Sequence, residues 1–254
     1  MSDPRRIGRE YYDSSDYFDG RDARHIVDVD SRFQRYRVEK VLEIHAPQPG
    51  DRIVDLGCGW GTFSFALAAR GCQVIGVDFS RRSIDFCEAR RAALPPGQRE
   101  RLSFLRADGG ETGLNPDSYD LVLAADLFEH LYPEDSERVV REAYRLLTPG
   151  GRFSVWTPHR GHILEVLKNR GIILKPDITH VDYKSMDRMR SLLQEAGFEI
   201  EKAYYAESHV PILRRAERVL QRWVPILRRR IAILGRKPRT SEATRTDHPN
   251  QGSP

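Results

Sequence analysis

The chain has 254 residues, of which 39% are hydrophobic and 31% are charged, a balance that suits one globular domain with a charged surface. No apolar run reaches the length of a transmembrane helix, and the first residues lack the apolar stretch of a secretory signal. The 3 cysteines form no C-x-x-C pair, so a disulfide or zinc framework is disfavoured and reduced thiols in the cytoplasm are expected.

The formal net charge of +4 is unevenly distributed along the chain. Residues 209–254 hold 11 Lys and Arg but only 3 Asp and Glu, so this region carries +8 while residues 1–208 carry −4. A partner that binds positive charge would therefore meet the C-terminal region.

Residues 1–30 are polar, rich in Tyr and Asp, and are expected to form an N-terminal arm. Apolar residues at helical spacing predict a helix over residues 32–45, which ends at Pro47 and the following Pro-Gly pair. From there strands and helices alternate. Strands are predicted over residues 52–56, 73–77, 102–105, 119–124, 152–157, 198–205 and 229–234. Helices are predicted over residues 62–70, 83–93, 134–147 and 185–196.

Strands separated by helices of about ten to fifteen residues are typical of βαβ units and a largely parallel sheet. The predicted fold class is α/β: a Rossmann-like, doubly wound sheet of seven mostly parallel strands, in a single domain over residues 31–237. A helical insertion is expected over residues 208–228, and residues 238–254 have the composition of a disordered tail. Ligands of such folds bind at the carboxyl ends of the strands.

Three glycines, Gly57, Gly59 and Gly61, directly follow the first predicted strand and open a helix. They allow a tight turn and a close approach of a ligand to the backbone, and the helix N-terminus behind them favours a phosphate or a carboxylate. Asp78 ends the second strand, where an acidic side chain accepts hydrogen bonds from ribose hydroxyls. Taken alone, these features also fit a nicotinamide dinucleotide as the ligand, and hence an NAD-dependent oxidoreductase. The glycines by themselves also fit a tight turn without a ligand.

Several segments in order resemble the motifs of class I S-adenosylmethionine-dependent methyltransferases. Residues 54–61 look like motif I, residues 74–80 are similar to the second motif, residues 119–124 resemble motif IV, and residues 147–151 resemble the turn before the fifth strand. The resemblance implies S-adenosylmethionine as the cofactor, with Asp108 matching the acidic residue that contacts the adenine amino group. The cofactor-binding residues that it implies are Asp55, Gly57, Cys58, Gly59, Asp78, Phe79, Asp108, Gly109 and Ala125.

Two carboxylates and an imidazole follow motif IV, in the segment Asp126-Leu127-Phe128-Glu129-His130. On a helical turn, residues three and four apart lie on one face, so Asp126, Glu129 and His130 could hold a divalent cation such as Mg²⁺. The alternative is that Asp126 caps the helix while His130 packs against the cofactor loop. Both interpretations stay open on the residues alone.

The same segment is similar to the Glu-x-x-Glu-His segment of ubiquinone-biosynthesis O-methyltransferases, and the small-RNA 3′-terminal 2′-O-methyltransferases carry a comparable one. The resemblance implies a metal site of Asp126, Glu129, His130 and His180, with Asp126 as a shorter replacement for the first Glu. It also implies that Arg37 lies near the carboxylate of the cofactor.

Methyl transfer to oxygen requires that the acceptor hydroxyl lose its proton, to a histidine base or with the help of a metal. The candidate catalytic residues are His130, His180 and His159, which follows the fifth strand. The Asn/Asp-Pro-Pro-aromatic motif expected for a nitrogen acceptor is missing after strand four, which favours an oxygen acceptor and leaves a carbon acceptor as an alternative.

Residues 210–230 place apolar residues at helical spacing with arginines between them. This pattern is typical of a lid over the acceptor site, and also of a basic amphipathic helix on an anionic membrane surface. With the apolar segment 163–174, it favours a small, lipid-linked or glycan-like acceptor. Aromatic residues are sparse among the arginines, so nucleic acid is disfavoured, and an RNA 2′-O-methyltransferase is the alternative enzyme. A non-catalytic cofactor-binding module is the alternative of another class.

Overall fold

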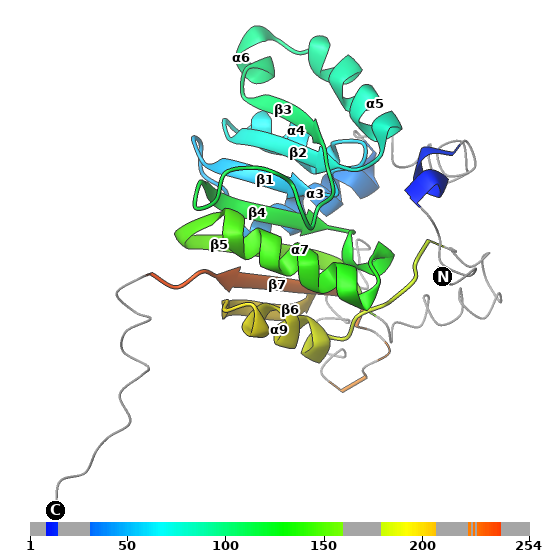
Figure 1. Cartoon of the computed structure of the whole chain (residues 1–254), viewed down its shortest axis with the longest axis vertical. Coiled ribbons are helices and arrows are strands. Elements are labelled where there is room, and N and C mark those ends of the chain that lie inside the picture. The colour runs from blue at the N-terminus through cyan, green and yellow to red at the C-terminus, as the bar shows by residue number, and fades with distance from the viewer. Residues whose placement is uncertain are drawn as a thin grey trace, which may run out of the picture.

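The computed structural model describes residues 9–14, 31–159, 179–206, 223–224, 226 and 228–239. Its centre is one seven-stranded sheet with the order β3-β2-β1-β4-β5-β7-β6 (Figure 1). All neighbouring strands from β3 to β5 are parallel, whereas β7 is antiparallel to both β5 and β6. The strands are β1 (Arg52–Leu56), β2 (Gln73–Asp78), β3 (Leu102–Arg106), β4 (Tyr119–Ala125), β5 (Leu147–Pro158), β6 (Glu199–Ala206) and β7 (Arg230–Arg236).

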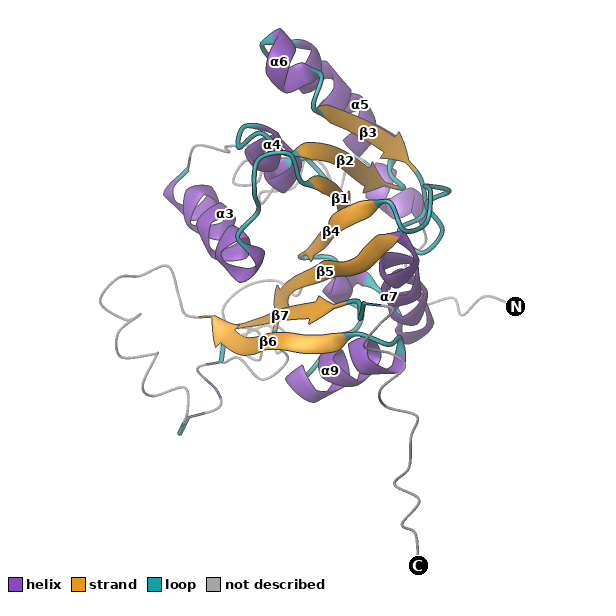
Figure 2. Ribbon diagram, turned by 90° about the vertical axis from the view of Figure 1, so that its left-hand side faces the viewer, coloured by secondary structure: helices purple, strands orange, loops and turns teal. Residues whose placement is uncertain are grey.

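Helices cover both faces of the sheet, with α3 and α4 on one side and α7 and α9 on the other (Figure 2). One apolar core joins the first face to α3, α4 and α5, and a second core joins the other face to α7 and α9. The helices are α3 (Arg32–His45), α4 (Thr62–Ala68), α5 (Arg81–Ala92), α6 (Pro96–Arg99), α7 (Pro133–Leu146) and α9 (Met186–Glu195), with short 3-10 turns η1 (Arg9–Asp13) and η2 (Phe128–His130).

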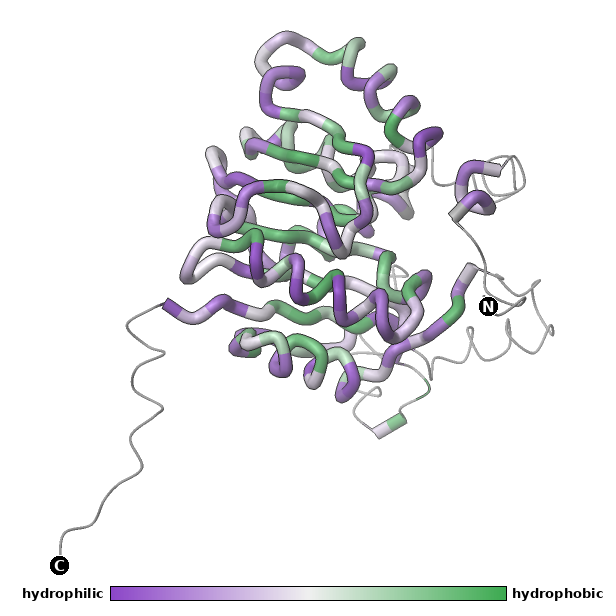
Figure 3. Tube along the Cα trace, in the orientation of Figure 1, coloured by the Kyte–Doolittle hydropathy of each residue, from purple (hydrophilic) through white to green (hydrophobic). Residues whose placement is uncertain are grey.

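The hydropathy of the chain explains this layering. Figure 3 shows apolar residues along the central strands and a mixture of polar and apolar residues along α7. In α7 the buried positions include Val139, Val140, Ala143 and Leu146, at the three-to-four spacing of one helical face. Burying that face against the sheet stabilises the helix more than its intrinsic propensity does.

Side-chain caps define where three of the helices begin. The hydroxyls of Ser31, Ser80 and Ser185 accept hydrogen bonds from the backbone N–H groups of Gln34, Ser83 and Arg188, respectively. Such caps satisfy donors that the first turn of a helix leaves without partners.

The predicted α/β fold with a mostly parallel seven-stranded sheet is confirmed. Strand boundaries agree within one or two residues, except that β5 begins at Leu147. In the turn expected at residues 147–151, Leu147 is paired with Tyr119, and the register with β4 then shifts before Arg152. The arm beyond residues 9–14, the segment 163–174, most of the insertion 208–228 and residues 240–254 of the tail lie outside the described residues. Within the described part of the chain, no helix is long and apolar enough to cross a membrane.

Candidate active site

The glycine loop joins the end of β1 to α4 in a conformation that requires glycine. Gly57 and Gly59 have φ values of 68° and 50°, in the left-handed region. A Cβ atom on Gly57 would lie 2.7 Å from Cδ1 of Leu127, whereas one on Gly59 would meet nothing within 4 Å. The N–H groups of Gly57 and Cys58 both donate to the carbonyl of Val77, at 2.8 and 3.0 Å. The loop is therefore fastened to β2, with open space beside Gly59.

Asp78, at the end of β2, is fastened to the same loop. Its carboxylate accepts hydrogen bonds from the N–H groups of Gly59 and Ser80, both at 2.9 Å. Burial raises the pKa of Asp78, and these two bonds oppose the rise. A carboxylate offers about four acceptor positions, so the two bonds orient Asp78 and leave capacity for further hydrogen bonds.

Asp55 is a buried residue of β1, just before the glycine loop. It is 1% exposed, and it accepts a hydrogen bond of 2.6 Å from the Ser64 hydroxyl in α4. Burial raises the pKa of Asp55 to about 7. Its side-chain hydrogen bond is thus with α4, the helix that follows the loop.

Asp108 follows β3 and is also held by the backbone. It accepts from the N–H of Gly110 at 2.8 Å and pairs with the Arg138 guanidinium of α7 at 3.3 Å. The neighbouring Gly109 would accommodate a Cβ in ordinary contact with Val139. Ala125, the last residue of β4, is buried at the same edge.

The N-terminal turn η1 contacts this edge of the sheet (Figure 1). The Tyr12 ring packs edge-on against Phe79 at 5.3 Å and against His130 at 6.0 Å. Asp13 accepts hydrogen bonds from the Ser80 hydroxyl at 2.6 Å and from the N–H of Arg82 at 3.3 Å. These contacts were missed in the sequence, where the richness of the arm in Tyr and Asp was the only signal.

A potential metal-binding group lies after β4. Ligand atoms of Glu129, His130 and His180 are all within 4.8 Å of one another. Nδ1 of His130 lies 3.0 Å from the carbonyl oxygen of Thr179. Because a carbonyl only accepts, Nδ1 carries the hydrogen and the lone pair of the neutral ring is on Nε2. Nδ1 of His180 lies 2.7 Å from the Tyr183 hydroxyl. Both rings are therefore oriented by a second hydrogen bond, as metal-binding histidines usually are.

Glu129 has the chemistry of a buried ligand. It is 2% exposed, and the Thr157 hydroxyl donates to its carboxyl group at 3.0 Å. Burial, reinforced by the negative charge of Asp126, raises the pKa of Glu129 to about 8. A cation beside this carboxyl would stabilise its ionised form, so the three residues fit a divalent metal.

Asp126 belongs to a different group of side chains. Its backbone is left-handed, with φ of 54°, and its carboxylate forms ion pairs with Arg37 and Arg230. Burial acts to raise the pKa of Asp126, but the two guanidinium groups outweigh it and hold the pKa below its usual value. The structure thus brings together three of the four expected metal ligands and places the fourth between two arginines.

His159 is also apart from the potential metal-binding group. Its Nδ1 lies 3.1 Å from the carbonyl oxygen of Arg228, and its ring packs against Tyr205 at 5.0 Å. Burial lowers the pKa of His159, so its neutral form is favoured. It remains a candidate base at the carboxyl end of β5.

Comparison with known proteins adds the family to this geometry. Residues 53–151 match a family model described as a methyltransferase domain. The chain is 32% identical over 161 residues to a ubiquinone biosynthesis O-methyltransferase of Ralstonia nicotianae, covering 62% of this chain and 64% of the relative. It is 34% identical over 122 residues to a demethylmenaquinone methyltransferase of Clavibacter sepedonicus, covering 48% and 46%. The chain therefore spans less than two thirds of these relatives.

Solved structures of low sequence identity share the fold. A magnesium protoporphyrin IX methyltransferase from Synechocystis with bound S-adenosylhomocysteine superimposes with a TM-score of 0.64 at 19% identity, covering 90% of this chain and 97% of that one. A phosphoethanolamine N-methyltransferase of Haemonchus contortus gives a TM-score of 0.69 at 18% identity, covering 93% and 62%. Residues 53–151 therefore carry a methyltransferase domain, and the chain shares the fold of S-adenosylmethionine-dependent methyltransferases.

Proposed function

We propose that this protein transfers a methyl group from S-adenosylmethionine to a hydroxyl oxygen of a small or lipid-linked acceptor, with help from a divalent cation. The observation that carries the proposal is the convergence of Glu129, His130 and His180 beside the cofactor edge of the sheet. The Tyr12 ring, which contacts both Phe79 and His130, joins the cofactor side to this group.

The residues have separate tasks in this proposal. When bound, S-adenosylmethionine supplies an electrophilic methyl group, and a divalent cation supplies charge that lowers the pKa of the acceptor hydroxyl. Asp78 and Asp108 orient the ribose and the adenine, while Glu129, His130 and His180 hold the cation. Methyl transfer needs little covalent help from the protein, and positioning alone supplies about 7–11 kcal/mol in well-oriented systems. The lone pair on Nε2 of His130 gives an alternative route for the acceptor proton.

The acceptor is proposed from the relatives and from the surface near β7. The names of the relatives concern ubiquinone, demethylmenaquinone and 27-O-demethylrifamycin SV. Trp223 is 81% exposed, and Val224 and Ile226 are exposed close to it in the sequence, just before Arg228. Exposed apolar side chains next to arginines suit an amphipathic acceptor and peripheral contact with an anionic membrane.

A methyl-transfer assay tests the reaction. Labelled S-adenosylmethionine is incubated with a panel of catechols that differ only in the length of a prenyl chain, and with an RNA that has a free 3′ end. We expect transfer to at least one catechol and none to the RNA. Transfer to the RNA alone would replace the proposed acceptor, and tight binding of NAD without binding of S-adenosylmethionine would refute the proposal.

The metal is tested separately. Excess chelator and the variant His180→Ala are each expected to lower kcat at least about tenfold, because both remove a source of positive charge at the acceptor hydroxyl. Added Mg²⁺ restores the chelated enzyme but not the variant. Asp120→Ala is the control, because Asp120 pairs with Arg52 where the parallel strands begin, away from the potential metal-binding group. Full activity in excess chelator would contradict the participation of a divalent cation and leave His130 as the base for the acceptor proton.

A further inference from the structure

Three residues at the ends of β5 and β6 and just before β7 form a cluster that the proposed reaction does not use: His159, Tyr205 and Arg228. The Arg228 guanidinium lies 4.9 Å from the centre of the Tyr205 ring, and the His159 ring packs against the same ring at 5.0 Å. Nδ1 of His159 also lies 3.1 Å from the carbonyl oxygen of Arg228. The side chain and the backbone of Arg228 are therefore both held in place.

The cluster lies on the same face of the sheet as the potential metal-binding group. Thr157 of β5 and Tyr205 of β6 are both paired with Ile231 of β7, and the side chains of directly paired residues share a face. The Thr157 hydroxyl donates to Glu129, a member of the potential metal-binding group. Two strand spacings separate Tyr205 from Thr157 by about 10 Å, so a small molecule can reach both.

His159 connects the two places along β5. Its backbone N–H donates to the carbonyl of Arg229 at 3.0 Å, which continues the pairing with the β7 chain. Residues two apart in an extended strand share a face and lie about 7 Å apart, so His159 is on the same face as Thr157. Burial lowers the pKa of His159, and the charge of Arg228 acts in the same direction. The ring therefore stays neutral, and the positive charge of the cluster belongs to Arg228.

The carboxylates nearby are matched by other cations. Asp126 pairs with two arginines, and Asp182 pairs with Lys184 at 2.8 Å. Burial raises the pKa of Glu129 to about 8, so this carboxyl is mostly uncharged at neutral pH until a cation binds. These acidic groups therefore leave the edge near Arg228 without excess negative charge.

The sequence that follows β5 and β6 is basic as well. Residues 160–178 hold 4 Lys and Arg against 2 Asp and Glu, and residues 207–230 hold 7 against 2. Together these two stretches carry +7, whereas the rest of the chain carries −3, because the total is +4. Both stretches follow strands that end at the carboxyl edge of the sheet. Positive charge concentrated in the chain at one edge favours an anionic ligand there.

We propose that Arg228 binds an anionic group of the acceptor, a carboxylate or a phosphate, and that Tyr205 is the positioning residue that holds its guanidinium. A guanidinium matches both anions in shape and forms charge-assisted hydrogen bonds with them. This inference rests on the proposed function, because it names the class of molecule that the same site would methylate. The acceptor hydroxyl would lie at the potential metal-binding group and the anionic group at Arg228.

Three catechols that differ in one ring substituent test the proposal: a carboxylate, a phosphonate and an uncharged carboxamide. Isothermal titration measures their binding with S-adenosylhomocysteine and Mg²⁺ present, so that no methyl group is transferred. The wild type is expected to bind at least one anionic catechol about tenfold or more tightly than the carboxamide, the effect of one charge-assisted hydrogen bond. The tighter of the two anionic catechols identifies the preferred anion.

Variants assign this preference to the cluster. Arg228→Gln should weaken binding of the preferred anionic catechol about tenfold and change binding of the carboxamide less than about twofold. Arg228→Lys, which keeps the charge, should recover part of the loss. Tyr205→Leu removes the ring under the guanidinium and should weaken binding of the anionic catechol alone, by about threefold. A chelator should leave the preference in place; its loss would mean that the cation holds the anionic group and would overturn the proposal.

Arg236→Gln is the matched control, because Arg236 pairs with Glu199 at the opposite end of β7. Its affinities for all three catechols should equal those of the wild type, and thermal unfolding checks that each variant keeps the fold. Equal losses for all three catechols in Arg228→Gln would overturn the proposal, since a purely structural role affects them alike. A wild type that binds none of them, or binds all equally, would overturn it as well.

A membrane role of Arg228 is distinguished with vesicles of phosphatidylglycerol. If Arg228→Gln loses binding to the vesicles but keeps the preference for the anionic catechol, the arginine contacts lipid and the proposal is overturned. A protein that prefers the anionic catechol but transfers no methyl group would support the inference while refuting the proposed function.

Discussion

The proposed cofactor side and the proposed acceptor side of the site hold their charged groups in different ways. On the cofactor side, Asp78 accepts hydrogen bonds from two backbone N–H groups, and Asp108 accepts one. On the acceptor side, Asp126 is held by two arginine side chains and Glu129 by a threonine hydroxyl. Backbone donors come from the next few residues or the adjacent loop, whereas side-chain partners come from distant elements. The cofactor side is therefore encoded locally and the acceptor side by the whole fold.

Two acidic residues near the glycine loop also have side-chain partners: Asp108 pairs with Arg138, and Asp55 accepts from the Ser64 hydroxyl. Burial raises the pKa of Asp55 from 3.8 to about 7, so the folded protein favours the protonated carboxyl. The stability that comes from this proton is complete below about pH 4 and is lost as the pH rises through 7. We expect the free energy of unfolding of the wild type, relative to Asp55→Asn, to fall between pH 4 and 7 by an amount on the order of 4 kcal/mol.

Urea unfolding of both proteins at several pH values measures this difference. The comparison with Asp55→Asn cancels the contributions of other titrating groups. If the difference in the free energy of unfolding stayed constant across this pH range, Asp55 would be ionised in the folded protein. Its carboxylate would then be better solvated than its burial indicates.

Lys184 differs from these acidic residues, because three backbone carbonyls hold it together with the Asp182 carboxylate, which lies 2.8 Å from its ammonium group. Its ammonium group donates to the carbonyls of Phe128, Leu131 and Asp182 at 2.9–3.1 Å, and it is 3% exposed. These carbonyls belong to the turn that carries Glu129 and His130 and to the chain beside it. Lys184→Met leaves the carbonyls without their donor, and we expect a loss of about 3 kcal/mol in stability and weaker metal binding.

Calorimetric melting and a metal titration of Lys184→Met measure the two effects. The exposed pair Arg52 and Asp120 provides the control, since Arg52→Met is expected to cost less than about 1 kcal/mol. If Lys184→Met melts at the same temperature as the wild type, the carbonyls have other donors and the lysine does not hold the turn.

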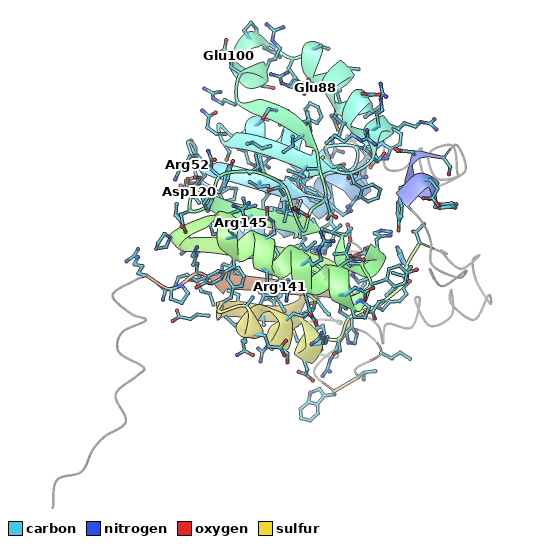
Figure 4. The ribbon with its side chains drawn as sticks, viewed as in Figure 1. Arg52, Glu88, Glu100, Asp120, Arg141 and Arg145 are labelled. Atoms are coloured by element: carbon cyan, nitrogen blue, oxygen red, sulfur yellow. The ribbon has the colours of Figure 1, made fainter. Side chains whose placement is uncertain are left out.

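A substitution of Asp78 tests how much its two backbone hydrogen bonds contribute to cofactor binding. Asp78→Ala removes the acceptor of two backbone hydrogen bonds and of the proposed ribose bonds. We expect the affinity for S-adenosylmethionine to fall about 100-fold, the effect of roughly two charge-assisted bonds. Asp120→Ala is the control, because Asp120 lies with Arg52 where the parallel strands begin, at the opposite edge (Figure 4). Similar affinities for both variants would place the ribose elsewhere.

The smallest expected effect comes from substituting Tyr12, whose ring contacts a residue on each of the two sides. Tyr12→Leu removes the ring that packs on both Phe79 and His130. Aromatic pairs contribute about 0.5–1.5 kcal/mol, so we expect KM for S-adenosylmethionine to rise roughly fivefold with little change in kcat. Tyr204→Leu, on the exposed side of β6, should leave KM unchanged. A loss of kcat without a change in KM would mean that Tyr12 acts on the acceptor and not on cofactor binding.

The sequence predicted the fold and the glycine loop because both depend on signals within a few residues. Alternating strands and helices defined the sheet, and Gly57, Gly59 and Asp78 lie where the motif places them. Asp55 shows the limit of this reasoning. It stands within the motif, but the partner of its side chain, Ser64, depends on how α4 packs on β1.

The acceptor side was predicted less completely because its partners are far apart in the chain. Asp126 is 89 residues from Arg37 and 104 residues from Arg230. Spacing on a helical turn grouped Asp126 with Glu129 and His130, but the left-handed backbone at Asp126 directs its carboxylate to the arginines. The direction of β7, on which Arg230 depends, has no local signal.

The pairing of β6 with β7 has a consequence for how such an enzyme could change its acceptor. Ala206, the last residue of β6, is paired with Arg230, the first residue of β7. The chain between them leaves the sheet and returns to it at neighbouring positions, so the cost of closing this loop grows only slowly with its length. Segments of different length and composition could be exchanged between these two residues without altering the sheet. A graft between Ala206 and Arg230 would therefore test whether this segment takes part in choosing the proposed acceptor, while the pairing of β6 with β7 is kept.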